Sequence, residues 1–152
     1  MLYAKRTGLK STRRQVIIMY KVVICDDNRE YVEKCAKAIT LCAKKNQIDI
    51  EISCYYSGEE LLFNYCEKSF YADVIYLDIL MNKVNGMETA RKLRDIGCSA
   101  QIVFLSRITD FVYDAFEVDA VQYLVKGEIV EDKFEKVFLK SIKLAEQRNE
   151  EL

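Results

Sequence analysis

The sequence predicts an α/β domain with a doubly wound parallel sheet, in which helices cover both faces of five strands. Two observations predict this class. The runs at 22–24, 74–77 and 102–105 are continuously apolar, as is typical of parallel strands that are buried on both faces. Segments with helical periodicity alternate with these runs, and right-handed crossovers then place helices on both sides of the sheet. The chain has 152 residues and is 51% hydrophobic, which is enough to bury the core of one such domain.

The first half of the chain supplies two strands and two helices in this scheme. After the strand at 22–24, an apolar stripe at helical spacing runs from Val32 to Ala43. Residues 48–54 alternate apolar and polar side chains. Such alternation is typical of a strand with one face or rim in water, so we place it at an edge of the sheet. Ser57 and Glu60 form a capping box that opens a second helix.

The third strand and the third helix follow directly. The apolar run at 74–77 leads into a helix predicted from about residue 86 to residue 96. This helix is expected to stop at Gly97, because glycine is suited to the left-handed conformation of a helix C-cap. The apolar run at 102–105 is then the fourth strand.

The last part of the chain predicts two helices around a second edge strand. Thr109 can cap a fourth helix, which would turn three residues toward the core: Val112, Ala115 and Phe116. The strand at 120–125 contains a glutamine, which places it at the other edge, and a fifth helix runs from about 132 to 148. The whole is a (βα)₅, flavodoxin-like three-layer sandwich, for which the strand order 2-1-3-4-5 is the common solution.

Charge divides the chain near residue 20. The first 20 residues carry five basic and no acidic side chains, so the remainder has a net charge of −6. We expect residues 1–19 to be a basic leader that is disordered or precedes the native start, and residues 20–150 to form the domain. A basic leader could also touch nucleic acid or membrane.

Composition excludes several other classes. The sequence has no apolar stretch of the roughly 20 residues that a bilayer crossing needs, and no signal-peptide pattern at its start. A cytoplasmic protein without a membrane partner is therefore expected. The six cysteines form no C-x-x-C pair and the chain has no histidine, so the cysteines are predicted to be reduced thiols rather than ligands of a structural zinc ion.

Charged and hydroxyl side chains follow four of the predicted strands. These residues are Asp26 and Asp27 after the first strand, Asp78 after the third, Ser106 after the fourth and Lys126 after the fifth. The carboxyl ends of neighbouring parallel strands lie side by side, so these groups should meet in one crevice. Carboxylates beside an ammonium can hold a divalent cation and a phosphoryl group.

Each of these residues has a simpler interpretation when it is taken alone. The pair Asp26 and Asp27 could be a helix N-cap, and Asp78 could be a solvated carboxylate in a turn. Lys126 could guard an edge strand, and Ser106 could be a small loop residue. Because all of them follow strands at the same edge of one sheet, a shared site is the favoured interpretation.

Four segments resemble the receiver domain of bacterial two-component response regulators, over about residues 20–147. They read V-I-C-D-D-N, V-I-Y-L-D-I-L-M…N-G-M, I-V-F-L-S and Y-L-V-K. The stretch F-V-Y-D-A-F-E-V-D-A-V-Q-Y-L-V-K is also similar to receivers that precede LytTR-type DNA-binding domains. The resemblance implies a signalling domain that catalyses only its own phosphorylation and slow dephosphorylation. A histidine kinase would be its phosphoryl donor, and DNA would be reached only through an output domain missing here.

The resemblance also implies a role for each residue of the predicted crevice. Asp78 would be the phosphoacceptor, with Asp27 touching the metal directly and Asp26 more often through water. The complete ligand set for Mg²⁺ (or Mn²⁺) would be Asp26, Asp27, Asp78 and the backbone carbonyl of Leu80. Lys126 would pair with Asp78 before the reaction and bind a phosphoryl oxygen after it, and Ser106 would bind another phosphoryl oxygen.

Further residues would act in switching and in hydrolysis. Tyr123 would be the switch partner of Ser106, although an aromatic residue in an edge strand is as often simply packed. Phosphorylation would favour a homodimer through a face that includes Phe111 and Val118. Hydrolysis of the phosphoryl group would be modulated by three neighbouring residues: Leu80, Arg107 and Ile108.

Three departures from the family pattern lie beside the predicted site. Gly127 and Asn82 stand where the family usually has proline, and the chain has no proline at all. Arg107 replaces the small residue that commonly follows the switch hydroxyl. Two alternative functions remain open from the sequence. One is a Mg²⁺-dependent phosphohydrolase that uses Asp78 as its nucleophile, and the other is a receiver-like interaction module that is never phosphorylated.

Overall fold

The computed structural model describes residues 18–67 and 71–151. The predicted leader at 1–19 therefore lies outside the described residues, except for Ile18 and Met19. Met19 is the first residue of strand β1. The helices of the described part of the chain are too short or too polar to cross a bilayer. All six cysteines are free thiols, and three of them are buried: Cys25, Cys35 and Cys98.

The sheet has five parallel strands in the order β2-β1-β3-β4-β5, as predicted. The strands are β1 (Met19–Cys25), β2 (Asp49–Tyr55), β3 (Val74–Leu77), β4 (Gln101–Ser106) and β5 (Gln122–Val125). The two strands with mixed polar and apolar character, β2 and β5, lie at the edges as expected.

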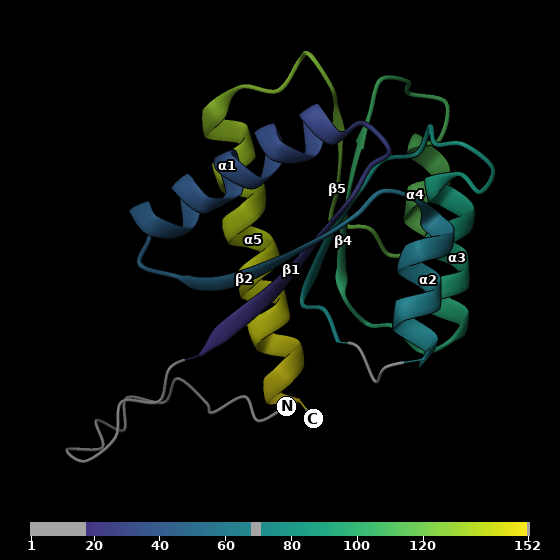
Figure 1. Ribbon diagram of the computed structural model, residues 1–152. Helices are drawn as coiled ribbons and strands as arrows, with labels where there is room; N and C mark the ends of the chain where they lie inside the picture. Colours follow the sequence, from purple (N-terminus) through teal and green to yellow (C-terminus); the bar gives the residue numbers. More distant parts are fainter. Residues whose placement is uncertain (1–17, 68–70, 152) are drawn as a thin grey trace.

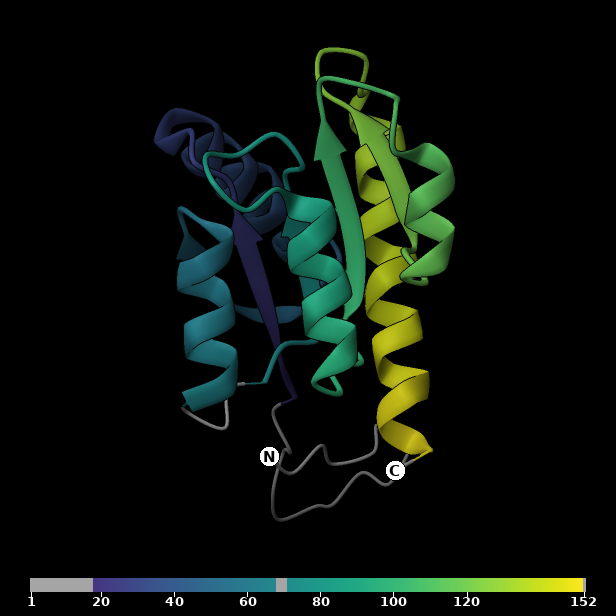
Figure 2. The same ribbon diagram turned by 90° about the vertical axis from the view of Figure 1, so that its right-hand side faces the viewer.

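Helices cover both faces of this sheet and make three layers (Figure 1). One face is covered by α1 (Arg29–Lys45) and α5 (Glu131–Glu150). The other is covered by α2 (Gly58–Glu67), α3 (Gly86–Asp95) and α4 (Val112–Glu117), which stand in front of the sheet in Figure 2. The predicted doubly wound class is confirmed.

The core consists of two apolar clusters, one on each side of the sheet. Along β1, Val22 and Ile24 pack in the cluster beneath α1 and α5, whereas Val23 packs in the cluster beneath α2 and α3. Successive strand side chains point to opposite faces. A central strand of a three-layer sandwich must therefore be apolar at every position, which explains the continuous apolar runs.

Two predicted helix boundaries are confirmed by their hydrogen bonds. The backbone N–H of Glu60 donates to the Ser57 hydroxyl at 3.1 Å and opens α2. At α3, the Asn85 side chain accepts from the N–H of Glu88 at 2.9 Å. Gly97 follows this helix with φ +89°, the left-handed conformation expected of it.

The predictions for the fourth helix are partly wrong. Its N-cap is Phe111 and no side chain caps it, so Thr109 does not have the predicted role. Phe116, expected in the core, is 74% exposed, and Val118, expected on an interaction face, is 2% exposed. The cause is the spacing of the buried positions. In a helix of six residues the buried stripe advances by three residues, from Ala115 to Val118, and Phe116 falls outside it.

Candidate functional site

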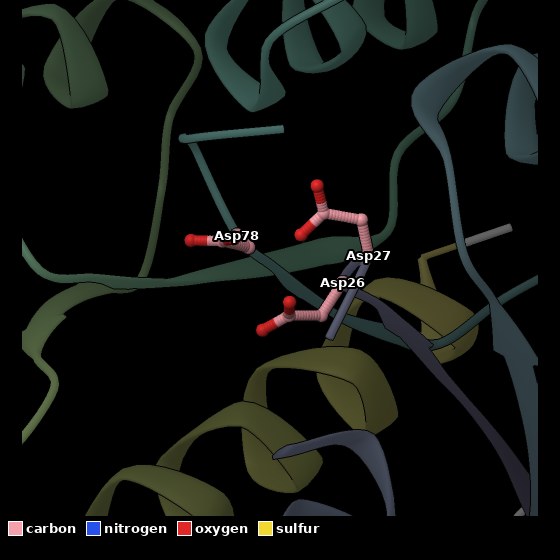
Figure 3. A group of neighbouring side chains, drawn as sticks. All are labelled: Asp26, Asp27 and Asp78. Carbon is pink, nitrogen blue, oxygen red and sulfur yellow. The ribbon is translucent and has the colours of Figure 1, made fainter. Parts of the chain in front are cut away.

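Three aspartates meet at the carboxyl ends of β1 and β3. Asp26 and Asp27 follow β1, and Asp78 follows β3. One carboxylate oxygen from each lies within 4.8 Å of the others, and Figure 3 shows the three side chains gathered at this end of the sheet. Asp26 and Asp78 are buried, whereas Asp27 is exposed. The structure therefore brings together the three carboxylates that the sequence analysis singled out.

Backbone pairing in the sheet fixes these positions. Cys25 pairs with Leu77 in the register of β1 and β3, so the residue after each strand lies at the same level. The N–H of Asp78 donates to the carbonyl of Cys25 at 2.9 Å, and the N–H of Asp26 donates to the carbonyl of Tyr55 at 3.1 Å. The carboxylates consequently sit on rigid strand ends rather than on a free loop.

Lys126 completes the cluster from the end of β5. Its N–H donates to the carbonyl of Ser106 at 2.8 Å, and its ammonium lies 2.7 Å from Asp26 and 3.5 Å from Asp78. The side chain is only 7% exposed. A pairing of this lysine with Asp78 was expected from the resemblance, but the shorter contact is with Asp26. Lys126 therefore bridges two carboxylates.

The environment of Asp78 disfavours its ionised form. Burial and, to a smaller extent, the negative charge of Asp26 together raise the pKa of Asp78 to about 6, while Lys126 acts in the opposite direction. The Oδ1 atom of Asp78 is buried and accepts no close hydrogen bond from the described residues; the Lys126 ammonium faces it at 3.5 Å. A buried oxygen with so weak a contact is costly, and a cation or a reacting group could satisfy it better.

The donor set fits a hard divalent cation. Carboxylate oxygens are the ligands that Mg²⁺ prefers, and three carboxylates face a single ammonium here. Both carboxylate oxygens of Asp26 already accept hydrogen bonds. Its Oδ1 accepts the N–H of Asn28 at 2.9 Å, and its Oδ2 accepts from the ammonium of Lys126. Asp27 and Asp78 have more oxygen lone pairs to offer. Asp26 is therefore the least free of the three to contact a cation directly.

The predicted switch residues lie together beside this cluster. Ser106 is fully buried, and its hydroxyl accepts the N–H of Ile108 at 3.3 Å. The hydroxyl of Tyr123 donates to the carbonyl of Ile108 at 2.5 Å, and its ring lies 6.1 Å from that of Phe104. Burial raises the pKa of Tyr123. Tyr123 thus holds the loop that begins at Ser106, rather than serving only as packing.

The remaining predicted residues lie around the rim. Leu80 is 48% exposed and Arg107 is exposed. The fourth helix exposes two large apolar side chains that were not predicted there, Tyr113 at 85% and Phe116 at 74%. They lie on the outer side of α4, which the sequence analysis assigned to Phe111 and Val118. Phe111 is instead partly buried against the core beneath α2 and α3.

Gly86 has a role at the site that the sequence analysis did not detect. A Cβ atom at Gly86 would lie 1.9 Å from the carbonyl oxygen of Asp78 and 2.8 Å from the Cα of Ile79. The N–H of Gly86 donates to the carbonyl of Ile79 at 2.8 Å. Only glycine permits this close approach of α3 to the loop after Asp78. Its signal in the sequence is the N-G pair that opens the helix.

Comparison with known proteins identifies the class to which this fold and site belong. The family model for the response regulator receiver domain matches residues 22–137. The chain therefore belongs to the response regulator receiver domain family, and its context is two-component signalling.

Relatives with established names agree with this membership. The sensory transduction protein LytT of Bacillus anthracis is 31% identical over 109 residues, which cover 71% of this chain and 42% of LytT. The positive alginate biosynthesis regulatory protein of Pseudomonas aeruginosa is 34% identical over 76 residues, covering 50% of this chain and 30% of that protein. The chain thus spans less than half the length of these relatives.

Solved structures of receiver domains share the fold. The response regulatory domain of mrkE from Klebsiella pneumoniae has a TM-score of 0.73 at 23% identity, covering 84% of this chain and 98% of that one. The response regulator TrrA of Thermotoga maritima, solved with Mg²⁺ and a beryllium fluoride, has a TM-score of 0.66 at 26% identity, covering 81% and 99%.

In the presence of a chelator at neutral pH, we expect the Asp78→Asn variant to have a higher free energy of unfolding than the parent protein. The folded-state pKa of Asp78 is about 6 and its ordinary value is 3.8, so folding favours the protonated carboxyl. The ionised form therefore costs stability. That cost is absent below about pH 4, grows between about pH 4 and 6, and stays constant above, at no more than about 3 kcal/mol.

Urea unfolding of both proteins at pH 4 and at pH 8, about two units either side of the folded-state pKa, measures this difference. Asp95→Asn is a matched control, because Asp95 is exposed on α3 and its substitution should change stability little at either pH. An equal effect of Asp78→Asn at the two pH values would contradict the expectation.

Proposed function

We propose that this chain is a phospho-accepting receiver domain of a two-component response regulator, with Asp78 as the residue that takes the phosphoryl group. The observation that carries the proposal is the state of the Asp78 carboxylate. It is buried, one of its oxygens has no hydrogen-bond partner among the described residues, and it faces two carboxylates and an ammonium. The large majority of buried carboxylate oxygens that serve only the fold are hydrogen-bonded.

In the proposed reaction an oxygen of Asp78 attacks the phosphorus atom of a phosphohistidine or a small acyl phosphate. The new O–P bond forms while the bond to the leaving group breaks, and the leaving group keeps the electron pair. The chain contains no histidine, so a phosphohistidine donor has to be another protein. A histidine kinase is the proposed partner. The free thiols of this chain suit the reducing cytoplasm, where we place the reaction.

Charge is the main obstacle to this attack. Two like charges about 4 Å apart repel by roughly 4 kcal/mol at an effective dielectric constant of about 20, and Asp78 faces two other carboxylates besides the incoming phosphoryl group. A bound Mg²⁺ (or Mn²⁺) would neutralise this charge. We propose that Asp27 and Asp78, the backbone carbonyl of Leu80 and, through water, Asp26 hold it.

Lys126 and Ser106 are proposed to bind the transferred group. The ammonium of Lys126 is 3.5 Å from Asp78, within reach of an oxygen added to that carboxylate. Lysine is a compact point charge that can exchange one anionic partner for another. The buried hydroxyl of Ser106 can rotate away from its bond with Ile108 and donate to a second phosphoryl oxygen.

The proposed readout passes from Ser106 to the fourth helix. Ser106 and Tyr123 both bond to Ile108, so a change in the Ser106 bond alters the loop that Tyr123 holds. This loop leads into α4, whose exposed Tyr113 and Phe116 offer an apolar surface to a second copy of the chain. We therefore propose a phosphorylation-dependent homodimer that uses these two residues rather than Phe111 and Val118. An output on DNA would need a part of the regulator outside this receiver domain.

With Mg²⁺ and acetyl phosphate, we expect the protein to gain the mass of one phosphoryl group, and to gain none in excess chelator. Asp78→Asn should abolish the gain, because it removes the nucleophile. Mass spectrometry of the intact protein measures both. The control is Asp95→Asn, because Asp95 is exposed. Asp73 would not serve, because it is buried. Undiminished labelling of Asp78→Asn would refute the assignment, and rapid release of phosphate with no labelled protein would favour the phosphohydrolase alternative.

We expect the phosphorylated protein to be long-lived, and polar substitutions at Leu80 or Ile108 to shorten its lifetime. Hydrolysis needs a water in line with the Asp78–phosphorus bond, and neither apolar side chain can orient that water, while Arg107 can occupy the space beside it. Leu80→Asn and Ile108→Glu should each speed the loss of the phosphoryl group by roughly tenfold, about 1.4 kcal/mol of barrier. Leu41→Asn, on the exposed side of α1, is the control. Unchanged decay in both variants would mean that these residues only cover the sheet end.

Phosphorylation is expected to strengthen self-association, by a coupling of about 1–3 kcal/mol. Phe116→Ser should remove this increase, because it removes a 74% exposed aromatic ring from α4. The matched control is Phe63→Ser, which removes a 62% exposed ring from α2. Sedimentation of the phosphorylated and unphosphorylated forms compares them. If Phe116→Ser and Phe63→Ser behave alike, the α4 surface is not the dimer interface.

A further inference from the structure

We infer that Tyr31 is a positioning residue for Lys126, and that its aromatic ring holds the lysine ammonium between Asp26 and Asp78. This inference rests on the proposed function, because Lys126 is the residue proposed to bind the transferred phosphoryl group. Tyr31 lies in the first turn of α1, far from Lys126 in the sequence.

The ammonium of Lys126 has three close neighbours. Asp26 lies at 2.7 Å and Asp78 at 3.5 Å, and the centroid of the Tyr31 ring lies at 4.0 Å. The lysine side chain is only 7% exposed, so water contributes little to its solvation. The face of an aromatic ring attracts a cation, and the attraction is stronger where the cation is desolvated. The ring thus replaces part of the missing water.

The position of the ring is tied to the same carboxylate that binds the lysine. Asp26 Oδ1 accepts the N–H of Asn28 at 2.9 Å, and Asn28 Oδ1 accepts the N–H of Tyr31 at 3.1 Å. The ring of Tyr31 contacts Lys126, which donates to Asp26 Oδ2 at 2.7 Å. These contacts form a closed circuit from Asp26 back to Asp26. A shift of the first turn of α1, which carries the ring, would therefore disturb the aspartate and the lysine together.

The backbone around Lys126 gives the side chain little further restraint. Its N–H is bonded to the carbonyl of Ser106, but the next residue is Gly127, with φ +86° and nothing within 4 Å of the position of a Cβ. Glycine permits more backbone conformations than any other residue, and the lysine side chain has four rotatable bonds. The ring contact at the ammonium adds to the ion pairs with Asp26 and Asp78 in restricting them.

A neutral ring suits the exchange of partners that the reaction requires. A third carboxylate beside Lys126 would compete with the phosphoryl group for the ammonium. The ring stabilises the cation without a charge of its own, so it helps to hold the lysine in place while leaving its N–H groups to the anionic partners.

The alternative is that Tyr31 only packs against the core beneath α1 and α5, where it also makes contacts. The two roles differ in their dependence on Lys126. A packing residue affects the protein equally whether or not the lysine is present. A residue that acts through the lysine has no further effect once the lysine has been removed.

The test measures the initial rate of Asp78 phosphorylation by acetyl phosphate with Mg²⁺. We expect Tyr31→Leu to lower this rate by roughly three- to tenfold and Tyr31→Phe, which retains the ring, to stay close to the parent rate. Tyr56→Leu is the matched control. This variant removes another aromatic ring that contacts α1. The centroid of the Tyr56 ring lies 3.9 Å from the guanidinium of Arg29 and the ring does not contact Lys126, so the rate should stay unchanged.

The same substitution is then made in a Lys126→Met background, with slow labelling followed over hours. Tyr31→Leu should cause no further loss there; an equal loss in both backgrounds would overturn the inference in favour of packing. A second readout needs no phosphorylation. The ε-methylene protons of Lys126 should show an upfield ring-current shift in nuclear magnetic resonance spectra, retained in Tyr31→Phe and lost in Tyr31→Leu.

The outcomes separate this inference from the proposed function. If the parent protein is not labelled on Asp78, the proposed function fails, and the ring-current shift still shows whether Tyr31 holds the lysine. If the parent protein is labelled and Tyr31→Leu reacts at the parent rate, only the inference fails. Absence of the ring-current shift in the parent protein would also overturn it.

Discussion

The interaction on which the rest of this structure depends is the contact of one ammonium with two buried carboxylates. Lys126 lies 2.7 Å from Asp26 and 3.5 Å from Asp78, at the ends of strands that are far apart in sequence. Without the lysine, these carboxylates would repel each other in a poorly solvated place, a strongly destabilising arrangement. The parallel sheet makes the contact possible because it holds all three residues at the same level by backbone hydrogen bonds. The surrounding helices exclude water, so these charges interact more strongly than they would in water.

A second buried carboxylate shows what a purely structural role looks like. Asp73, at the opposite end of the sheet, is fully buried. One of its oxygens accepts the N–H of Lys21 at 2.8 Å and the other accepts from Arg148 at 3.0 Å, which fixes the last turns of α5 to the sheet. Asp78 is nearly as inaccessible, yet its Oδ1 accepts no close hydrogen bond from the described residues and faces only the Lys126 ammonium at 3.5 Å. Of the two carboxylates, the one with the weaker contacts is the one that we propose to be chemically active.

The sequence predicted the parts of the fold and site that depend on strand order and strand ends. Continuous apolar runs identified the central strands, and the residues after them, such as Asp78 and Lys126, then had to meet at one edge. It failed where a short element or a side-chain direction decided the outcome. The fourth helix is too short for a stripe of apolar residues to fix its phase, so Val118 and Phe116 exchanged their expected places. The preference of Lys126 for Asp26 depends on the distance between side-chain atoms, which no spacing in the sequence encodes.

That preference bears on how the site would change state. While Lys126 is bonded to Asp26, one oxygen of that carboxylate is shared between the lysine and any cation that approaches. An added phosphoryl group on Asp78 would offer the ammonium a stronger anionic partner on its other side. As the lysine moved toward it, Asp26 would regain a free oxygen for the cation or its water ligands. Phosphoryl binding and cation binding would then support each other through one lysine, with the Tyr31 ring limiting how far that lysine can travel.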